Sequence, residues 1–275
     1  MKAVDFAFLD SGTGGLPYMQ YLHDACPTAS CMYLADTKNF PYGEKTQDQI
    51  NAAAISAVTA ILSKYSPSAI VIACNTMSVT SLSFLRKNFP NIPFVGTVPA
   101  IKLAAKLTKN KRIGLLATSS TVAHPYTKQL ENKFAHNCTV AKRGDPELVD
   151  FIEHALSTAS ATEIEKAIEP AVIFFVNQDV DIIILGCTHF LRIADQIQAI
   201  VDKTTKLLNK KTIRVIDSRD GVVRQAMKVA IKNSKSKIAK DAIQESFFYI
   251  TGSEPCSGFY ENIAKKHEIV YGGII

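Results

Sequence analysis

Short runs of aliphatic residues alternate along the chain with longer segments in which apolar positions recur every three or four residues. The short runs predict buried strands, and the longer segments predict helices with one apolar face. Strands are predicted at residues 4–9, 31–35, 69–73, 94–96, 112–117, 139–142, 181–185, 212–216 and 247–251. Helices are predicted from residue 16, after the capping residue Thr46 as far as residue 62, and over 77–87, 101–107, 148–156, 164–175, 193–200, 222–231 and 259–265. This alternation is typical of an α/β fold built on parallel sheets.

Two of the predicted strands end in matched units, Ala73-Cys74-Asn75-Thr76 and Gly186-Cys187-Thr188-His189. Each unit delivers a cysteine to the carboxyl end of a buried strand, where a helix is expected to follow. The repeat suggests two halves that each carry a thiol. Ligands of parallel α/β sheets bind beyond the carboxyl ends of the strands. Other polar residues expected at such ends are Asp10, Thr118 and Asp217.

The first predicted strand runs into a glycine-rich turn, Asp10-Ser11-Gly12-Thr13-Gly14-Gly15. Such a turn can hold a phosphate or carboxylate on its N–H groups, or it can be a plain tight connection. The glycine spacing of a dinucleotide site and the Gly-Lys-Ser/Thr of a Walker loop are both missing. A second loop, Phe40-Pro41-Tyr42-Gly43, could present Tyr42 and the Gly43 amide to a ligand or simply turn the chain.

The 275 residues, 47% of them hydrophobic, suffice for one large domain or two smaller ones. The net charge of +6 is concentrated in lysine-rich stretches at 203–211 and 228–240. No aromatic residues are interleaved with these lysines in a nucleic-acid-binding motif, which favours a solvated face over a nucleic-acid partner. The amino terminus shows no signal-peptide pattern, and no apolar run is long enough for a membrane span. The cysteines are too sparse for a disulfide scaffold, so we expect a protein of the reducing cytoplasm.

The six cysteines show neither CxxC spacing nor a cluster with histidine that fits zinc, so no metal site is expected. For either cysteine of the matched units taken alone, the first interpretation is a small buried hydrophobic residue. A hydrolase could pair Cys187 with His189, but Cys74 would then be idle, and a redox pair more often uses CxxC. Two opposed acid/base thiols would use both cysteines without a cofactor. That reaction is racemisation.

An amino acid's α-hydrogen is a weak acid, so a thiolate can remove it only where the developing carbanion is stabilised and water is excluded. Hydrogen-bond donors to the substrate carboxylate are needed, and the residues near the predicted strand ends supply them. Asp10 is expected at a strand end like those that carry the cysteines, and His189 follows Cys187 by two residues. Both could therefore tune the proton affinity of the thiols. The candidate donors are Ser11, Asn75, Thr76, Thr118, Thr121 and Thr188.

Taken together, these motifs resemble the glutamate racemase family of cofactor-independent amino-acid racemases. The resemblance runs through nearly the whole chain, and the combination is far more specific than any single piece. The matching stretches are Asp10-Ser11-Gly12-Thr13-Gly14-Gly15, Pro41-Tyr42-Gly43, Ala73-Cys74-Asn75-Thr76, Gly186-Cys187-Thr188-His189-Phe190 and Ile216-Asp217-Ser218.

The resemblance implies interconversion of L- and D-glutamate for peptidoglycan by two thiols and no cofactor. Cys74 would take the proton from the D isomer and Cys187 from the L isomer, with Asp10 and His189 assisting. It implies two pseudo-symmetric α/β domains, 1–98 plus 212–275 and 99–211, with the active site in the cleft between them. Substrate contacts would be made by Ser11, Tyr42, Gly43, Asn75, Thr76, Thr118, Thr121 and Thr188.

Several features depart from the family pattern. Phe190 is followed by Leu191, where an aromatic residue and then proline are frequent. Asp145-Pro146 stands where Cys-Pro often precedes a glutamate in the second domain. Glu153 is the candidate for that catalytic carboxylate, and a surface helix acid is the alternative. A related racemase acting on aspartate or another amino acid also remains open, as does a binding protein without turnover. A homodimer is compatible with the sequence.

Overall fold

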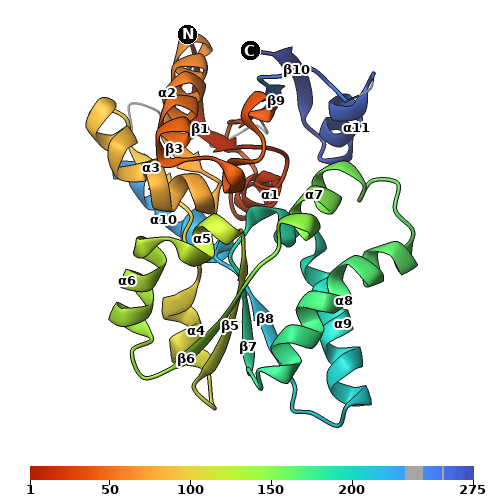
Figure 1. Cartoon of the computed structure of the whole chain (residues 1–275). Coiled ribbons are helices and arrows are strands. Elements are labelled where there is room, and N and C mark those ends of the chain that lie inside the picture. Colours follow the sequence, from red (N-terminus) through yellow and green to blue (C-terminus); the bar gives the residue numbers. More distant parts are fainter. Residues whose placement is uncertain (233–243, 256) are drawn as a thin grey trace. The chain divides into compact units, whose positions relative to one another are not determined.

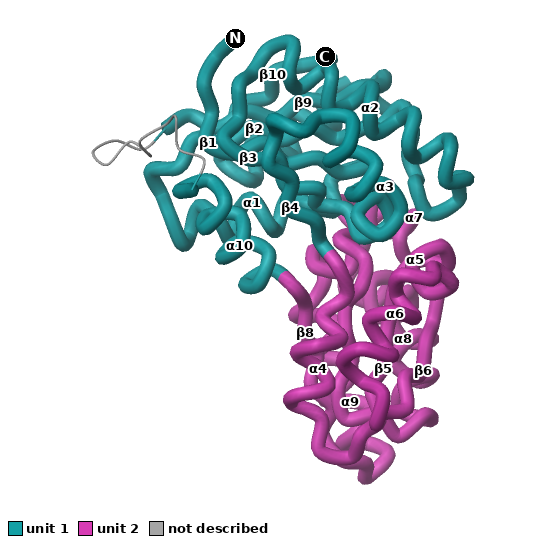
Figure 2. The backbone as a smooth tube through the Cα atoms, turned by 90° about the vertical axis from the view of Figure 1, so that its left-hand side faces the viewer, with its two compact units in different colours: residues 1–97, 219–275 teal, residues 98–218 magenta. Residues whose placement is uncertain are grey.

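The computed structural model describes residues 1–232, 244–255 and 257–275 (Figure 1). The chain divides into two compact units, the first comprising Met1–Thr97 and Arg219–Ile275 and the second Val98–Ser218 (Figure 2). Cys256 and most of the predicted lysine-rich stretch 228–240 lie outside the described residues. No helix in the described part of the chain is long and apolar enough to cross a membrane.

Unit 1 is built on one six-stranded parallel sheet. The strand order is β10 (Val270–Ile274), β9 (Phe247–Ile250), β2 (Cys31–Ala35), β1 (Lys2–Asp10), β3 (Tyr65–Ile72) and β4 (Phe94–Gly96). α1 (Leu16–Ala25) packs with α10 (Arg219–Lys232), and α2 (Gln47–Lys64) packs with α3 (Asn75–Asn88). The remaining elements are α11 (Phe259–Lys266) and the short 3₁₀ helices η1 (Thr37–Asn39) and η2 (Tyr42–Glu44).

Unit 2 is built on a four-stranded parallel sheet with the order β6 (Thr139–Gly144), β5 (Arg112–Ala117), β7 (Ile182–Leu185) and β8 (Arg214–Ile216). On one side of this sheet lie α4 (Ile101–Leu107) and α6 (Pro125–Phe134) (Figure 1). On the other lie α8 (Ala161–Asn177) and α9 (Ala194–Leu207). The shorter helices are α5 (Ser119–Ala123), α7 (Pro146–His154) and the 3₁₀ helix η3 (Thr188–Ile193).

Both units repeat one strand order. The first four strands of the chain are arranged β2-β1-β3-β4, and the next four are arranged β6-β5-β7-β8. Each sheet therefore begins at an inner strand, adds a neighbour on one side and then continues on the other side. The predicted fold class, two parallel-sheet α/β domains, is confirmed, and the shared order is a topological basis for the expected pseudo-symmetry.

The second crossing between the units falls later in the chain than the expected boundary at 211/212. β8 pairs with β7 through Ile182 opposite Arg214 and Ile184 opposite Ile216, so this strand completes the sheet of unit 2. Unit 2 consequently extends to Ser218. Hydrophobic patterning marks residues 212–216 as a strand, but it carries no information about which of two sheets the strand joins.

Local sequence signals account for several elements. Thr46 caps α2 in a capping box with Gln49, as its position ahead of the apolar repeat predicts. β10 was not among the predicted strands because Gly272 and Gly273 interrupt its apolar residues. At Gly272 an added Cβ would lie 2.2 Å from the Tyr249 ring, so glycine is needed for β10 to pack beside β9.

Candidate active site

Most of the expected site residues follow the strands at which each sheet reverses its strand order. In both units the ends of the first and third strands flank this switch point, the usual ligand site of open α/β sheets. Ala73, just before Cys74, donates its N–H to the Leu9 carbonyl at 2.8 Å. Gly186, just before Cys187, donates its N–H to the Leu116 carbonyl at 2.7 Å. The two cysteines thus occupy equivalent positions in their own sheets.

In unit 1, Cys74 is the N-cap residue of the 14-residue helix α3 and is 6% exposed. The N-terminus of a helix carries partial positive charge, which favours the thiolate form of a cysteine placed there. Asn75 and Thr76 form the buried first turn of the same helix. Asp10 is fully buried at the end of β1, and its Oδ1 accepts the N–H of Ser11 at 2.7 Å.

Asn75 is the most direct indication of a ligand in unit 1. Its side-chain oxygen is buried and has no hydrogen-bond partner among the described residues. A buried acceptor left unpaired costs roughly 1–3 kcal/mol, so native structures rarely keep one without a function. An ammonium or amide donor of a bound substrate would satisfy it.

The glycine-rich turn after β1 is held tightly against the rest of unit 1. The Tyr33 hydroxyl donates to the Gly12 carbonyl at 2.9 Å and accepts the Gly15 N–H at 3.0 Å. An added Cβ at Gly15 would lie 2.7 Å from the Ala73 Cβ and 2.8 Å from the Tyr33 hydroxyl oxygen. Glycine is therefore required at residue 15 by close packing beside the residue that precedes Cys74.

We expect Gly15→Ala to lower the free energy of unfolding by about 1–3 kcal/mol, the usual cost of overpacking a well-filled interior. The measurement is urea unfolding followed by circular dichroism. Gly221→Ala is the matched control, because a Cβ there meets nothing within 4 Å and alanine favours the helix α10. Equal stability of the Gly15→Ala variant and wild type would contradict the packing argument.

Tyr42 is buried, and its hydroxyl donates to Asp36. Burial raises the pKa of Tyr42 well above its ordinary value, and the charges of Asp36, Cys74 and Asp10 raise it further. Asp36 also accepts hydrogen bonds from Asn39 Nδ2 and from Thr251 Oγ1, the latter at 2.6 Å. Asp36 thus fixes the loop that carries Tyr42 and Gly43. Sequence reasoning missed this residue, although it directly follows β2 just as Asp10 ends β1.

In unit 2, Cys187, His189 and Glu153 form a buried chain. The Cys187 sulfur lies 3.7 Å from His189 Nδ1, and His189 Nε2 lies 3.2 Å from Glu153 Oε2. The side chains of His189 and Glu153 are only 3% and 2% exposed. Glu153 lies near the end of α7, which packs against η3, so the expected carboxylate is buried beside the histidine rather than on a helix surface.

This environment favours the protonated form of His189. Burial by itself would lower the pKa of His189, but the hydrogen bonds to Cys187 and Glu153 and the negative charges of both groups raise it to about 10. A protonated imidazole donates from Nδ1 toward the sulfur and from Nε2 toward the carboxylate. Its charge beside Cys187 stabilises a thiolate, the form that can remove a proton from carbon.

The other expected residues of unit 2 lie at the ends of β5 and β7. Thr118 caps α5 by accepting the Thr121 N–H at 3.2 Å, and the two hydroxyls are 3.0 Å apart. Thr188 is buried in the first turn of η3. Cys187 precedes this six-residue 3₁₀ helix, not the α-helix expected from the sequence, and α9 begins only at Ala194.

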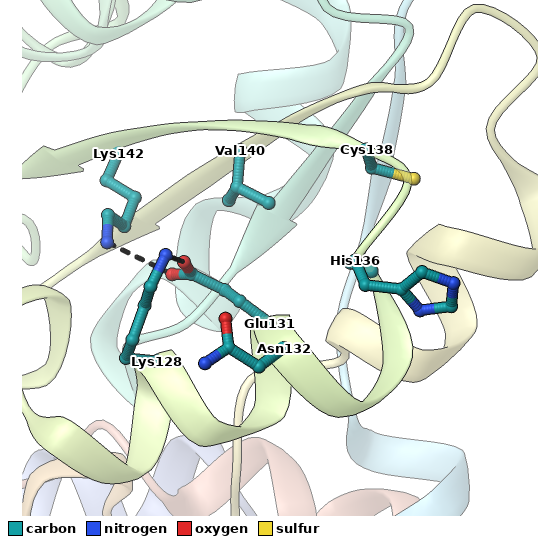
Figure 3. Close-up of a pocket in the computed structure, with 8 residues that line it drawn as sticks. Lys128, Glu131, Asn132, His136, Cys138, Val140 and Lys142 are labelled. Atoms are coloured by element: carbon teal, nitrogen blue, oxygen red, sulfur yellow. Dashed lines mark hydrogen bonds and ion pairs between the residues drawn. The ribbon is translucent and has the colours of Figure 1, made fainter.

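A recess of about 220 Å³ between α6 and β6 contains none of the expected site residues (Figure 3). Its lysines Lys128 and Lys142 both reach the nearly buried carboxylate of Glu131, at 3.3 and 3.1 Å. The two ammonium groups therefore already have an anionic partner. Among the residues that the structure describes, no group of three His, Cys, Asp or Glu side chains is placed to hold a metal ion.

Comparison with known proteins agrees with this arrangement. Residues 16–226 match the family model Asp/Glu/Hydantoin racemase. The chain belongs to this family. The racemase is 35% identical to the glutamate racemase of Treponema pallidum (strain Nichols) over 272 residues, which is 98% of this chain and 96% of that one. It is 38% identical to the glutamate racemase of Proteus mirabilis over 234 residues, or 84% and 78% of the two chains.

Among solved structures, the racemase is similar to Escherichia coli glutamate racemase in complex with L-glutamate and the activator UDP-MurNAc-ala. The TM-score is 0.80 at 28% identity, and the match covers 98% of both chains. Like other racemases, the protein is an isomerase. The structure brings the expected residues together as two groups, one around Cys74 in unit 1 and one around Cys187 in unit 2.

Proposed function

We propose that this racemase interconverts L- and D-glutamate without a cofactor, by proton transfer between the substrate α-carbon and two thiols. The buried Cys187–His189–Glu153 chain is the observation that carries this proposal. In this chain the thiol is next to an imidazole that favours its protonated form, and the imidazole is next to a carboxylate. Cys74 at the end of β3 is the second thiol, in the equivalent position of the other sheet.

In the L-to-D direction, the Cys187 thiolate takes the α-proton and the Cys74 thiol delivers a proton to the opposite face of the carbon. The D-to-L direction reverses both transfers. His189 stabilises the Cys187 thiolate. Asp10 assists Cys74 in a different way, as a carboxylate that can accept a hydrogen bond from the thiol. Glu153 keeps His189 protonated and oriented. The mechanism requires both thiols to reach one α-carbon from opposite faces.

The polar residues at the strand ends bind the substrate. The side-chain oxygen of Asn75 accepts a hydrogen bond from the substrate ammonium. Because this oxygen has no partner in the described part of the structure, no existing hydrogen bond of Asn75 Oδ1 has to break. Donors for the two carboxylates come from hydroxyl groups and backbone N–H groups, which also stabilise the charge that develops on the α-carboxylate as the proton leaves. These residues are Ser11, Gly43, Thr76, Thr118, Thr121 and Thr188, together with Tyr42, which would donate through its backbone N–H because its hydroxyl donates to Asp36.

The test is α-proton exchange in deuterium oxide, followed by proton NMR with L-glutamate and L-aspartate in separate incubations. We expect loss of the glutamate α-proton signal and formation of D-glutamate, with aspartate exchanging far more slowly. The glutamate racemase relatives support this substrate. Faster exchange of aspartate would overturn the glutamate assignment while leaving the two-thiol chemistry in place.

The role that follows is supply of D-glutamate for peptidoglycan. A free thiol pair operates where thiols stay reduced, which favours the cytoplasm as the site of action. We include a homodimer in the proposal, and size-exclusion chromatography with light scattering tests it.

A further inference from the structure

Arg192 lies on the same face of η3 as His189. A 3₁₀ helix has three residues per turn, so side chains three positions apart are aligned. His189 and Arg192 are spaced in this way within η3 (Thr188–Ile193), and both point to the last turn of α7. Both also reach the same atom: Glu153 Oε2 is 3.2 Å from His189 Nε2 and 3.6 Å from Arg192 Nη1.

The guanidinium makes a second contact that fixes the carboxylate in place. Arg192 Nη1 donates to the Ile152 carbonyl at 3.1 Å, one residue before Glu153. This carbonyl belongs to the last turn of α7, where carbonyls have no partner within the helix. Arg192 therefore anchors both the backbone and the side chain at the point where Glu153 projects toward His189.

The electrostatics favour a functional role over a surface ion pair. The side chains of Arg192 and Glu153 are 13% and 2% exposed, so water screens their interaction little. An ionised carboxylate at this depth is unfavourable unless cations and hydrogen bonds compensate for its lost hydration. Removal of the guanidinium takes away a cation at Oε2, which favours protonation or displacement of Glu153.

We propose that Arg192 is a positioning residue of this racemase, which holds the ionised Glu153 against His189 and so sustains proton transfer at Cys187. The inference rests on the proposed function, because the proton transfer is the step that it supports. Arg192 does not touch the reacting atoms. It acts through Glu153 and then through His189.

The first test compares Arg192→Met, Arg192→Lys and wild type in glutamate racemisation. In metal sites, outer partners that orient a functional histidine change activity by roughly 10- to 100-fold. Because Arg192 acts one residue further out, we expect Arg192→Met to lower kcat/KM about tenfold. Arg192→Lys retains the charge and should recover part of the loss. Arg112→Met is the control, since Arg112 Nε also donates to a backbone carbonyl, that of Gln178, at the start of β5.

A double-mutant cycle tests whether Arg192 acts through Glu153. If it does, Arg192→Met should have little further effect in a Glu153→Gln background, because the charge that it holds is already gone. The same fold loss in both backgrounds would overturn the proposal. Thermal unfolding of each variant separates loss of stability from loss of positioning.

Isotope effects supply a readout that a merely structural role would not move. If Arg192→Met slows only the transfer at Cys187, that transfer becomes more rate-limiting in both directions. With L-glutamate deuterated at the α-carbon, the isotope effect on kcat/KM should then rise. With D-glutamate deuterated there, it should fall, because Cys74 removes that deuteron.

Two outcomes are distinguishable. Wild type without racemase activity would refute the proposed function itself. Active wild type, with Arg192→Met unchanged in kcat/KM and in both isotope effects, would refute only the role of Arg192.

Discussion

Replacement of either catalytic thiol by a hydroxyl is expected to abolish racemisation. A serine hydroxyl is a far weaker acid than a thiol, so it neither forms the base nor returns the proton at neutral pH. General acid–base groups contribute typically 10²–10⁴-fold, and we expect Cys74→Ser and Cys187→Ser each to lower kcat/KM by about 10³-fold or more. The measurement is formation of D-glutamate from L-glutamate and the reverse.

The two directions constrain each other in this experiment. Enantiomers have equal free energy in water, so the equilibrium constant is one, and kcat/KM must fall equally in both directions for every variant. Cys138→Ser is the control, since Cys138 is a partly exposed free cysteine outside both groups of site residues. Full activity in both Cys74→Ser and Cys187→Ser would refute the two-thiol mechanism.

Loss of the His189 imidazole is expected to have the second largest effect. His189→Asn removes the cation beside Cys187 and leaves Glu153 buried without the imidazole, and we expect kcat/KM to fall by about 100-fold. His154→Asn is the matched control. His154 lies on the same helix as Glu153 and contacts Asp150 at 3.0 Å, but the two side chains are 45% and 73% exposed. Equal losses in both variants would contradict a specific role for His189.

The same histidine predicts a pH dependence of stability. In the folded chain the pKa of His189 is raised to about 10 from an ordinary value near 6.5. A group whose pKa is higher in the folded state binds its proton more tightly there. Its contribution is fully present below pH 6.5 and is lost as the pH rises toward 10. The free energy of unfolding of wild type, relative to His189→Asn, should therefore fall over this range. A constant difference would show that Cys187 and Glu153 do not hold a proton on the ring.

Much of the fold follows from local pattern. The aliphatic runs predicted most strands, Thr46 predicted the start of α2, and the two strand–cysteine units predicted both thiols. These features depend on residues close together in the sequence, where periodicity and capping operate. β10 and α5 are not predicted, because glycines interrupt the first and hydroxyl residues dominate the second. α6 is not predicted because the residues that it buries, Thr127 and Glu131, are polar.

By itself the sequence determined the alternation of strands and helices, the position of a cysteine after each third strand, and the resemblance that pointed to racemisation. Only the tertiary structure decided which sheet β8 joins, that Asp36 supports Tyr42, and that α7 brings Glu153 between His189 and Arg192. The physical reason is sequence separation. Contacts between Glu153 and His189, 36 residues apart, depend on how α7 packs against η3, and no local pattern encodes that packing.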